Sequence, residues 1–174
     1  MIYRVNMSDL SVKSEPPSEK LELLGGRALT SQLIADEVPP SCHPLSAENK
    51  LVLAPGILTG TGAPCSGRLS AGAKSPLTKK IKESKSGGMG AIHLATCGVH
   101  ALIIEGKPAD DRTYRIVVRA DGVTVEHADD LAGLGNYDLV ARQHEKFGDQ
   151  ISCISIGPAG EMRLVVASIA VTDV

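Results

Sequence analysis

The chain has almost no aromatic side chains: three tyrosines, one phenylalanine and no tryptophan among 174 residues. Any core must therefore be aliphatic, and a nucleic-acid surface built from stacked bases is disfavoured. The formal net charge is only −2, so no positive excess attracts nucleic acid or an anionic membrane. No apolar run approaches the roughly 20 residues that a membrane span needs.

Export and cysteine-based metal signals are missing too. Residues 1–10 have no basic start followed by an apolar stretch and a small-residue cleavage site, so we expect a cytoplasmic protein. The four cysteines, Cys42, Cys65, Cys97 and Cys153, contain no C-x-x-C pair. They are therefore expected to be buried small side chains rather than disulfides or ligands of a zinc or iron–sulfur centre.

The common catalytic and nucleotide-binding motifs are also incomplete or missing. Residues 62–69 have the glycine spacing of a P-loop, but Arg68 replaces its lysine and Leu69 its Ser/Thr. Cys65 stands where a dinucleotide fingerprint needs its third glycine. No histidines are paired at i, i+4, and no G-x-S-x-G elbow is present. Ordinary nucleotide binding, hydride transfer and acid–base catalysis are therefore not indicated.

Short strands outnumber helices in the pattern of apolar residues. Helical spacing predicts three helices, at about residues 27–37, 88–97 and 137–147. Because helices do not alternate regularly with strands and Asp121-Gly122 favours a hairpin, we expect an α+β fold on a mostly antiparallel or mixed sheet. A glycine-led helix followed by an apolar strand occurs at residues 25–54 and again at 87–105, which suggests an internal duplication. The remaining strands are expected at residues 2–12 (two), 50–54, 68–74, 100–105, 114–119, 123–127, 150–156 and 163–170.

One stretch combines glycines with positive charge. Residues 68–85 contain six cations and a single anion, Glu83, and lie between two glycine-rich segments at 60–67 and 86–90. Glycines let backbone N–H groups approach phosphate oxygens, a helix N-terminus adds positive potential, and basic side chains neutralise the charge. The pattern therefore indicates a phosphorylated ligand, although a solvated lysine loop beside a turn has the same composition. The six cations are Arg68, Lys74, Lys79, Lys80, Lys82 and Lys85.

An ordered set of short segments resembles the start of the tungsten-containing aldehyde ferredoxin oxidoreductase family. The set includes L-T-G-T-G-A-P at residues 58–64 and G-P-A-G-E at 157–161, and it runs through nearly the whole chain in the family's order. The other segments are residues 4–6, 25–29, 36–40, 44–51, 66–68, 74–78, 86–88 and 103–107.

The resemblance implies a mainly β domain, residues 1–174, that forms a base for two pterins of the molybdopterin type holding one tungsten. It assigns the position of Arg68 to the pterin phosphates and those of Lys85 and Gly87 to the same site, with Gly88 beside them. In the whole enzyme it implies oxidation of an aldehyde to a carboxylic acid, with electrons leaving through a [4Fe–4S] cluster to ferredoxin.

Two departures from the family pattern qualify this expectation. Lys85 stands where the family usually has asparagine beside a magnesium ion, and a protonated lysine has no lone pair for a metal. The segments that carry the cluster cysteines and the catalytic acid and histidine do not occur in residues 1–174, so the isolated chain is expected to be inactive. The alternatives are an orphan or truncated domain without activity, or a subunit of a split oxidoreductase completed by another chain; a homodimer is also compatible with the resemblance.

Overall fold

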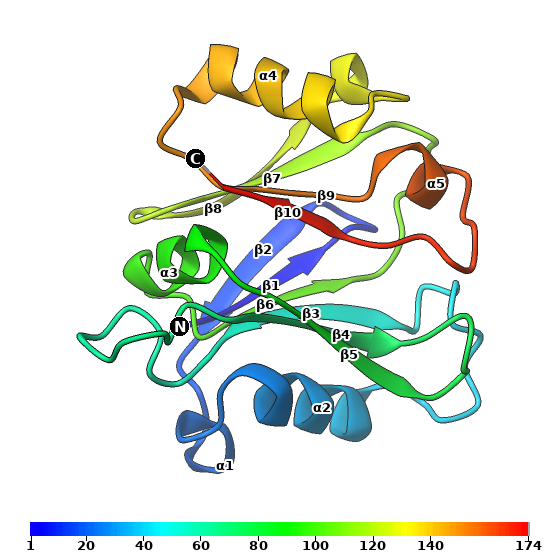
Figure 1. The fold of residues 1–174 in the computed structure, drawn as a ribbon. Helices are drawn as coiled ribbons and strands as arrows, with labels where there is room; N and C mark the ends of the chain where they lie inside the picture. The colour runs from blue at the N-terminus through cyan, green and yellow to red at the C-terminus, as the bar shows by residue number, and fades with distance from the viewer. Residues whose placement is uncertain (174) are drawn as a thin grey trace.

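The structure is a computed structural model that describes residues 1–173, which form one large sheet, two small sheets and several helices (Figure 1). The strands are β1 (Ile2–Asn6), β2 (Ser11–Glu15), β3 (Lys50–Pro55), β4 (Leu69–Lys74), β5 (Ile81–Ser86), β6 (Ala101–Glu105), β7 (Tyr114–Arg119), β8 (Gly122–His127), β9 (Cys153–Ser155) and β10 (Ala170–Thr172). The helices are α1 (Glu19–Glu22), α2 (Gly26–Glu37), α3 (Met89–Thr96), α4 (Asn136–Phe147) and α5 (Gly157–Glu161), with a 3-10 turn, η1, at Asp129–Leu131.

The large sheet has six strands in the order β2-β1-β6-β3-β4-β5. Only the β1–β6 pair is parallel, and the other neighbours run antiparallel. The central strands β6 and β3 are short and apolar, as expected of strands covered on both faces. The expected α+β class with a mixed sheet is therefore confirmed.

Helix α2 covers one face of this sheet (Figure 1). Its buried Leu29, Leu33 and Ile34 recur at helical spacing and share a core cluster with side chains of β1, β3 and β6. The helix ends before Pro39, which supplies no backbone donor. At Gly72 of β4 an added Cβ would lie 2.6 Å from the Thr30 Cβ, so glycine there lets α2 approach closely.

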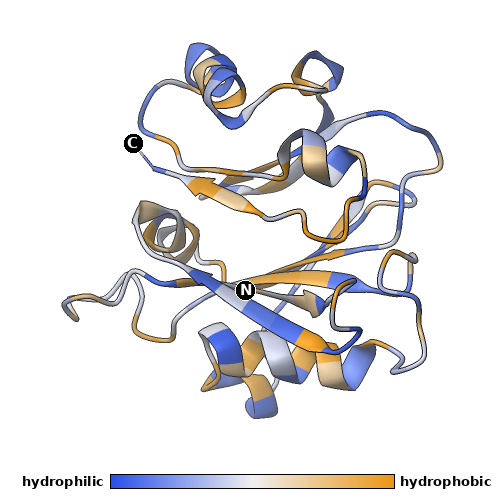
Figure 2. Cartoon of the chain, turned by 45° about the vertical axis from the view of Figure 1, so that its right-hand side comes forward, coloured by the Kyte–Doolittle hydropathy of each residue, from blue (hydrophilic) through white to orange (hydrophobic). Residues whose placement is uncertain are grey.

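The opposite face carries α3 and the β7–β8 hairpin, and α4 lies beyond the hairpin (Figures 1 and 2). A second aliphatic core joins the sheet to α3 and to Val123 of β8. Its sheet members include Val5, Leu53 and Leu102, which alternate along their strands with residues that face α2. The central strands of the sheet are thus buried on both faces.

Several expected boundaries were wrong. Residues 1–173 contain five α-helices instead of about three, because α1 and α5 span only four and five residues and leave no helical periodicity. Strand β5 was missed because its sequence, IKESKS, is polar on both faces. A strand was expected at residues 163–170, but the backbone turns there, with Ala167 N donating to Leu164 O, and β10 begins only at Ala170.

The two glycine-led helix–strand units lie side by side in the sheet. Strands β3 and β6 are antiparallel neighbours, and their helices α2 and α3 cover opposite faces. The next strand outward differs between the two units, since β1 is parallel to β6 whereas β4 is antiparallel to β3. The similarity suggested by the sequence therefore does not extend past each helix and its strand. No helix within residues 1–173 has the length and apolar character needed to traverse a bilayer.

Candidate functional site

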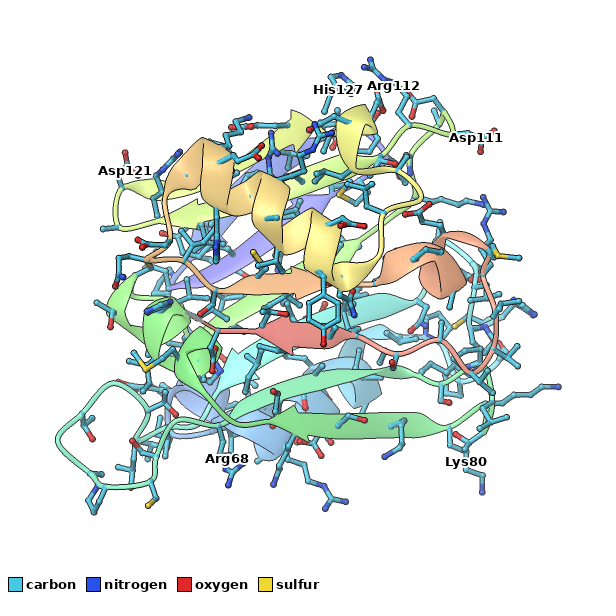
Figure 3. The ribbon with its side chains drawn as sticks, turned by 45° about the horizontal axis from the view of Figure 1, so that its top comes forward. Arg68, Lys80, Asp111, Arg112, Asp121 and His127 are labelled. Atoms are coloured by element: carbon cyan, nitrogen blue, oxygen red, sulfur yellow. The ribbon has the colours of Figure 1, made fainter. Side chains whose placement is uncertain are left out.

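The cationic stretch of the sequence forms the β4–β5 hairpin, which separates its six positive side chains. Lys80 lies at the turn, at the opposite end of the hairpin from Arg68 (Figure 3). Lys74 is buried and donates to Pro40 O and, at 2.7 Å, to Cys42 O. Lys82 pairs with Ala73 in the register, whereas Lys85 pairs with Ser70, so these two lysines point to opposite faces. Of the six cations, Arg68 and Lys85 lie at the same end of the hairpin.

Arg68 directly precedes β4 and lies across from Gly87. The β4–β5 register pairs Leu69 with Ser86, and one position further it brings Arg68 opposite Gly87. A Cβ added to Gly87 would lie only 2.8 Å from Arg68 Nη1, so the guanidinium lies directly over the Gly87 backbone. Within residues 1–173 this guanidinium is exposed and makes no ion pair or hydrogen bond with another side chain. Its backbone is held, because Gly56 N donates to Arg68 O at 3.1 Å.

Lys85 is a diagonal neighbour of Arg68 on the same face of the hairpin. It is exposed and pairs in the register with Ser70, whose hydroxyl donates to Glu83 Oε1 at 2.7 Å. The one carboxylate of the stretch is therefore engaged by a neutral hydroxyl, and no ion pair involving Lys85 occurs in the described part of the chain. Two cations thus face solvent without a carboxylate partner at this end of the hairpin.

Gly88 has a left-handed φ of +100° and ends the hairpin at the start of α3. The backbone N–H groups of Met89 and Gly90 donate to the carboxylate of Asp173, at 2.8 and 3.1 Å. The sequence predicted that the N-terminus of this helix would face a phosphate. Two of its N–H groups instead donate to a carboxylate of the same chain. Sequence reasoning missed Asp173, because it lies more than 80 residues from Met89 and Gly90 and belongs to no local motif.

A second set of charges lies at the far end of α2, and here every member is paired. We call Arg4, Glu15, Glu37, Lys50 and Glu105 the paired-charge cluster. Glu37, the last residue of α2, accepts from both terminal nitrogens of Arg4 at 2.8 Å and from Lys50 Nζ at 2.7 Å. The hydrogen bonds from Arg4, with those from Lys50, lower the pKa of Glu37 to about 2 although partial burial opposes this.

Apolar side chains are exposed around the C-terminal part of the chain. Tyr137 is 95% exposed, Val166 72% and Met162 70%. A hollow of about 280 Å³ lies between the starts of α4 and α5, lined in part by Asn136, Ile156 and Pro158. Exposed apolar side chains that gather in one patch often mark a contact with another protein.

Comparisons with known proteins agree with this fold. The family model described as "Aldehyde ferredoxin oxidoreductase, N-terminal domain" matches residues 2–174. The chain belongs to this family. Two tungsten-containing aldehyde ferredoxin oxidoreductases are each 37% identical to it: that of Pyrococcus furiosus over 169 residues, 95% of this chain, and that of Pyrococcus horikoshii over 171 residues, 97% of this chain.

A solved structure of another enzyme shares this fold. The chain matches, with a TM-score of 0.91 and 29% identity, the active-site complex BamBC of benzoyl coenzyme A reductase in complex with 1,5-dienoyl-CoA. The match covers 98% of this chain and 26% of that one. The chain likewise spans 28% of the length of each of the two Pyrococcus enzymes. Its family relatives are thus oxidoreductases more than three times its length.

Proposed function

We propose that the chain is the cofactor-binding domain of a tungsten-dependent oxidoreductase and that Arg68, Lys85, Gly87 and Gly88 bind the phosphates of its pterins. The observation that carries this proposal is the Arg68 guanidinium, which is unpaired within residues 1–173 and lies over a glycine. Arginine presents several N–H donors in a planar fork, which suits phosphate oxygens. We call these four residues the Arg68 site.

The residues of the Arg68 site fit a doubly phosphorylated cofactor of the molybdopterin type. Arg68 supplies the fork of donors, Lys85 a second positive charge, and Gly87 the space that a side chain would fill. When bound, the tungsten centre supplies the redox chemistry, while this domain binds and orients it. Magnesium fits less well, because a protonated Lys85 has no lone pair to offer. We infer that the Lys85 ammonium replaces part of the charge that magnesium supplies elsewhere in the family.

The proposed reaction of the whole enzyme is oxidation of aldehydes to carboxylic acids, with electrons passing through a [4Fe–4S] cluster to ferredoxin. The two Pyrococcus relatives, at 37% identity, support aldehyde oxidation. The benzoyl coenzyme A reductase match favours a second candidate, reduction of an aromatic ring, at the lower identity of 29%. Since both kinds of enzyme share this domain, the choice between them depends on residues outside it.

The domain is proposed to work with further catalytic domains or with a partner subunit, in the cytoplasm. Its relatives are more than three times longer, and the exposed Tyr137, Met162 and Val166 are suited to contact with another protein surface. Alone, the chain is expected to be inactive, since it supplies a cofactor site and no cluster-binding cysteine motif. A homodimer is a further arrangement that these apolar side chains allow.

Expression with tungstate in cells that make molybdopterin tests the proposal. Tungsten measured by mass spectrometry, and pterin measured by fluorescence after oxidation, should co-purify with the wild-type chain. Arg68→Ala should lower both at least about tenfold, as expected for loss of a charge-assisted contact. Lys82→Ala is the matched control, because Lys82 lies three residues from Lys85 on the other face of β5, and it should retain both.

Two results would contradict the proposal. One is a metal-free, pterin-free monomer, which would favour an orphan domain without activity. The other is equal loss in both variants, which would show that positive charge anywhere on the hairpin suffices. Aldehyde-dependent reduction of ferredoxin by the chain combined with its proposed partner would then separate aldehyde oxidation from ring reduction.

A further inference from the structure

The N-terminus of α3 accepts a cap from the carboxylate of Asp173, which lies far along the chain from this helix. Asp173, directly after β10, accepts from Met89 N at 2.8 Å with Oδ2 and from Gly90 N at 3.1 Å with Oδ1. The two oxygens thus satisfy two of the N–H groups that a helix leaves free in its first turn. A negative charge there also interacts favourably with the helix dipole.

The Gly87–Gly88 turn lies between this carboxylate and Arg68. An added Cβ on Gly88 would overlap Asp173 Oδ2, just as one on Gly87 would crowd Arg68 Nη1. The two charged groups thus contact adjacent glycines of this turn. Arg68 and Asp173 do not form an ion pair among the contacts of residues 1–173, which leaves the guanidinium available.

A serine hydroxyl extends the contact to a third element. Ser152 Oγ lies 2.9 Å from His93 Nδ1 on α3 and 3.4 Å from Asp173 Oδ1. These three residues do not have the hydrogen-bonding order of a Ser-His-Asp triad, because the carboxylate contacts the serine and not the histidine. Their geometry instead joins α3, the segment before β9 and the end of β10. These contacts stabilise the Gly87–Gly88 turn in addition to the hydrogen bonds between β4 and β5.

We propose that Asp173 is a positioning residue for the Arg68 site. By capping α3 it holds the Gly87–Gly88 turn in the one conformation that lies beneath the guanidinium, so Arg68 and the turn are arranged before a phosphorylated ligand arrives. Binding then costs less ordering of the backbone. The inference rests on the proposed function, since it assigns Asp173 a role in binding the same phosphates.

Pyrophosphate binding by the full chain, measured by titration calorimetry, tests this role together with amide hydrogen exchange. Asp173→Ala should weaken pyrophosphate binding about fivefold to tenfold, in line with the loss of a helix cap. Exchange should accelerate at Met89 and Gly90, while the N–H groups of α2 keep their protection. Asp173→Asn keeps an acceptor oxygen and should restore affinity to within about threefold of wild type. Asp121→Ala, an exposed acid at the β7–β8 turn, is the matched control (Figure 3).

The outcomes separate the two proposals. A wild-type chain that does not bind pyrophosphate overturns the proposed phosphate site and this inference with it. Wild-type binding with unchanged affinity in Asp173→Ala overturns the inference alone. Tighter binding in Asp173→Ala also overturns it, because the carboxylate would then be excluding anions from α3. Should Asp173→Ala not fold, Asp173→Ser still shortens the side chain and removes the carboxylate, and unchanged affinity in that variant would count equally against the inference.

Discussion

Charged side chains lie near both ends of helix α2, and the two sets differ in whether their cations are paired with carboxylates. At its C-terminal end Glu37 accepts hydrogen bonds from two cations of the paired-charge cluster. At its N-terminal end Gly26 lies near Ser70, the register partner of Lys85, and the cations beyond it have no carboxylate partner within residues 1–173. Both sets lie on the α2 face of the same sheet.

The difference separates structural charge from charge available for binding. Partly buried cations that are matched by carboxylates fasten α2 to β1, β3 and β6, and their charge is neutralised inside the fold. Arg68 and Lys85 gain no such stabilisation, so an external anion can bind them without first breaking an internal ion pair. Substitutions at the two ends of α2 should therefore affect different measurements.

The largest expected effect is on stability, at Glu37. Glu37→Ala removes one of the two carboxylates that Arg4 and Lys50 share and leaves these partly buried cations with Glu105 alone between them, which should cost about 3 kcal/mol of unfolding free energy. Urea denaturation followed by circular dichroism measures this. Glu15→Ala removes a mostly exposed partner of the same arginine and should cost less than about 1 kcal/mol. Equal losses in the two variants would show that burial does not distinguish these pairs.

Acid should weaken the paired-charge cluster in a defined range of pH. The pKa of Glu37 is about 2 in the fold against an ordinary 4.5, so its carboxylate stabilises the folded state above pH 4.5. That contribution, on the order of 3 kcal/mol, is lost as the pH falls from 4.5 toward 2. Unfolding free energies measured across this range should decline less steeply in Glu37→Gln, which has no carboxyl to protonate. Parallel pH profiles would place the acid sensitivity elsewhere.

Arg68→Ala should have the opposite profile, with a change in binding and almost none in stability. Loss of a charge-assisted contact predicts pyrophosphate binding weaker by about tenfold. Because Arg68 is exposed, its unfolding free energy should stay within about 0.5 kcal/mol of wild type. Calorimetric titration at several salt concentrations provides the measurement. A stability loss as large as that of Glu37→Ala would remove the contrast between the two ends of α2.

Lys85→Asn should give the smallest effect and tests the replacement of magnesium by an ammonium. Without magnesium, loss of one exposed positive charge should weaken pyrophosphate binding by about twofold to fivefold. With magnesium, the asparagine oxygen offers a lone pair, and affinity should return toward the wild-type value. Wild-type affinity should respond less to magnesium. Identical magnesium responses in both proteins would contradict the proposed substitution of charge.

The sequence predicted the apolar framework of the fold but not its short polar elements. Helices α2 and α4 and strands β3 and β6 carry apolar residues at regular spacing, and their positions were confirmed within one or two residues. Strand β5 has no such spacing. It belongs to the sheet through its hydrogen bonds with β4, which its own sequence does not reveal. The proximity of Arg68 and Gly87 was an expectation from the family resemblance, whereas the Asp173 cap depends on tertiary contact alone.

The position of β5 at the end of the sheet has a consequence for solubility. One side of this strand pairs with β4, and the other leaves backbone N–H and C=O groups that another chain's strand can pair with. Lys82 and Lys85 project from the two faces of that strand, and lysines on an outermost strand oppose such intermolecular pairing through repulsion and hydration. The lysine proposed for phosphate binding therefore also protects the protein against fibrous aggregation, so neutralising both lysines should promote self-association even where the fold is intact.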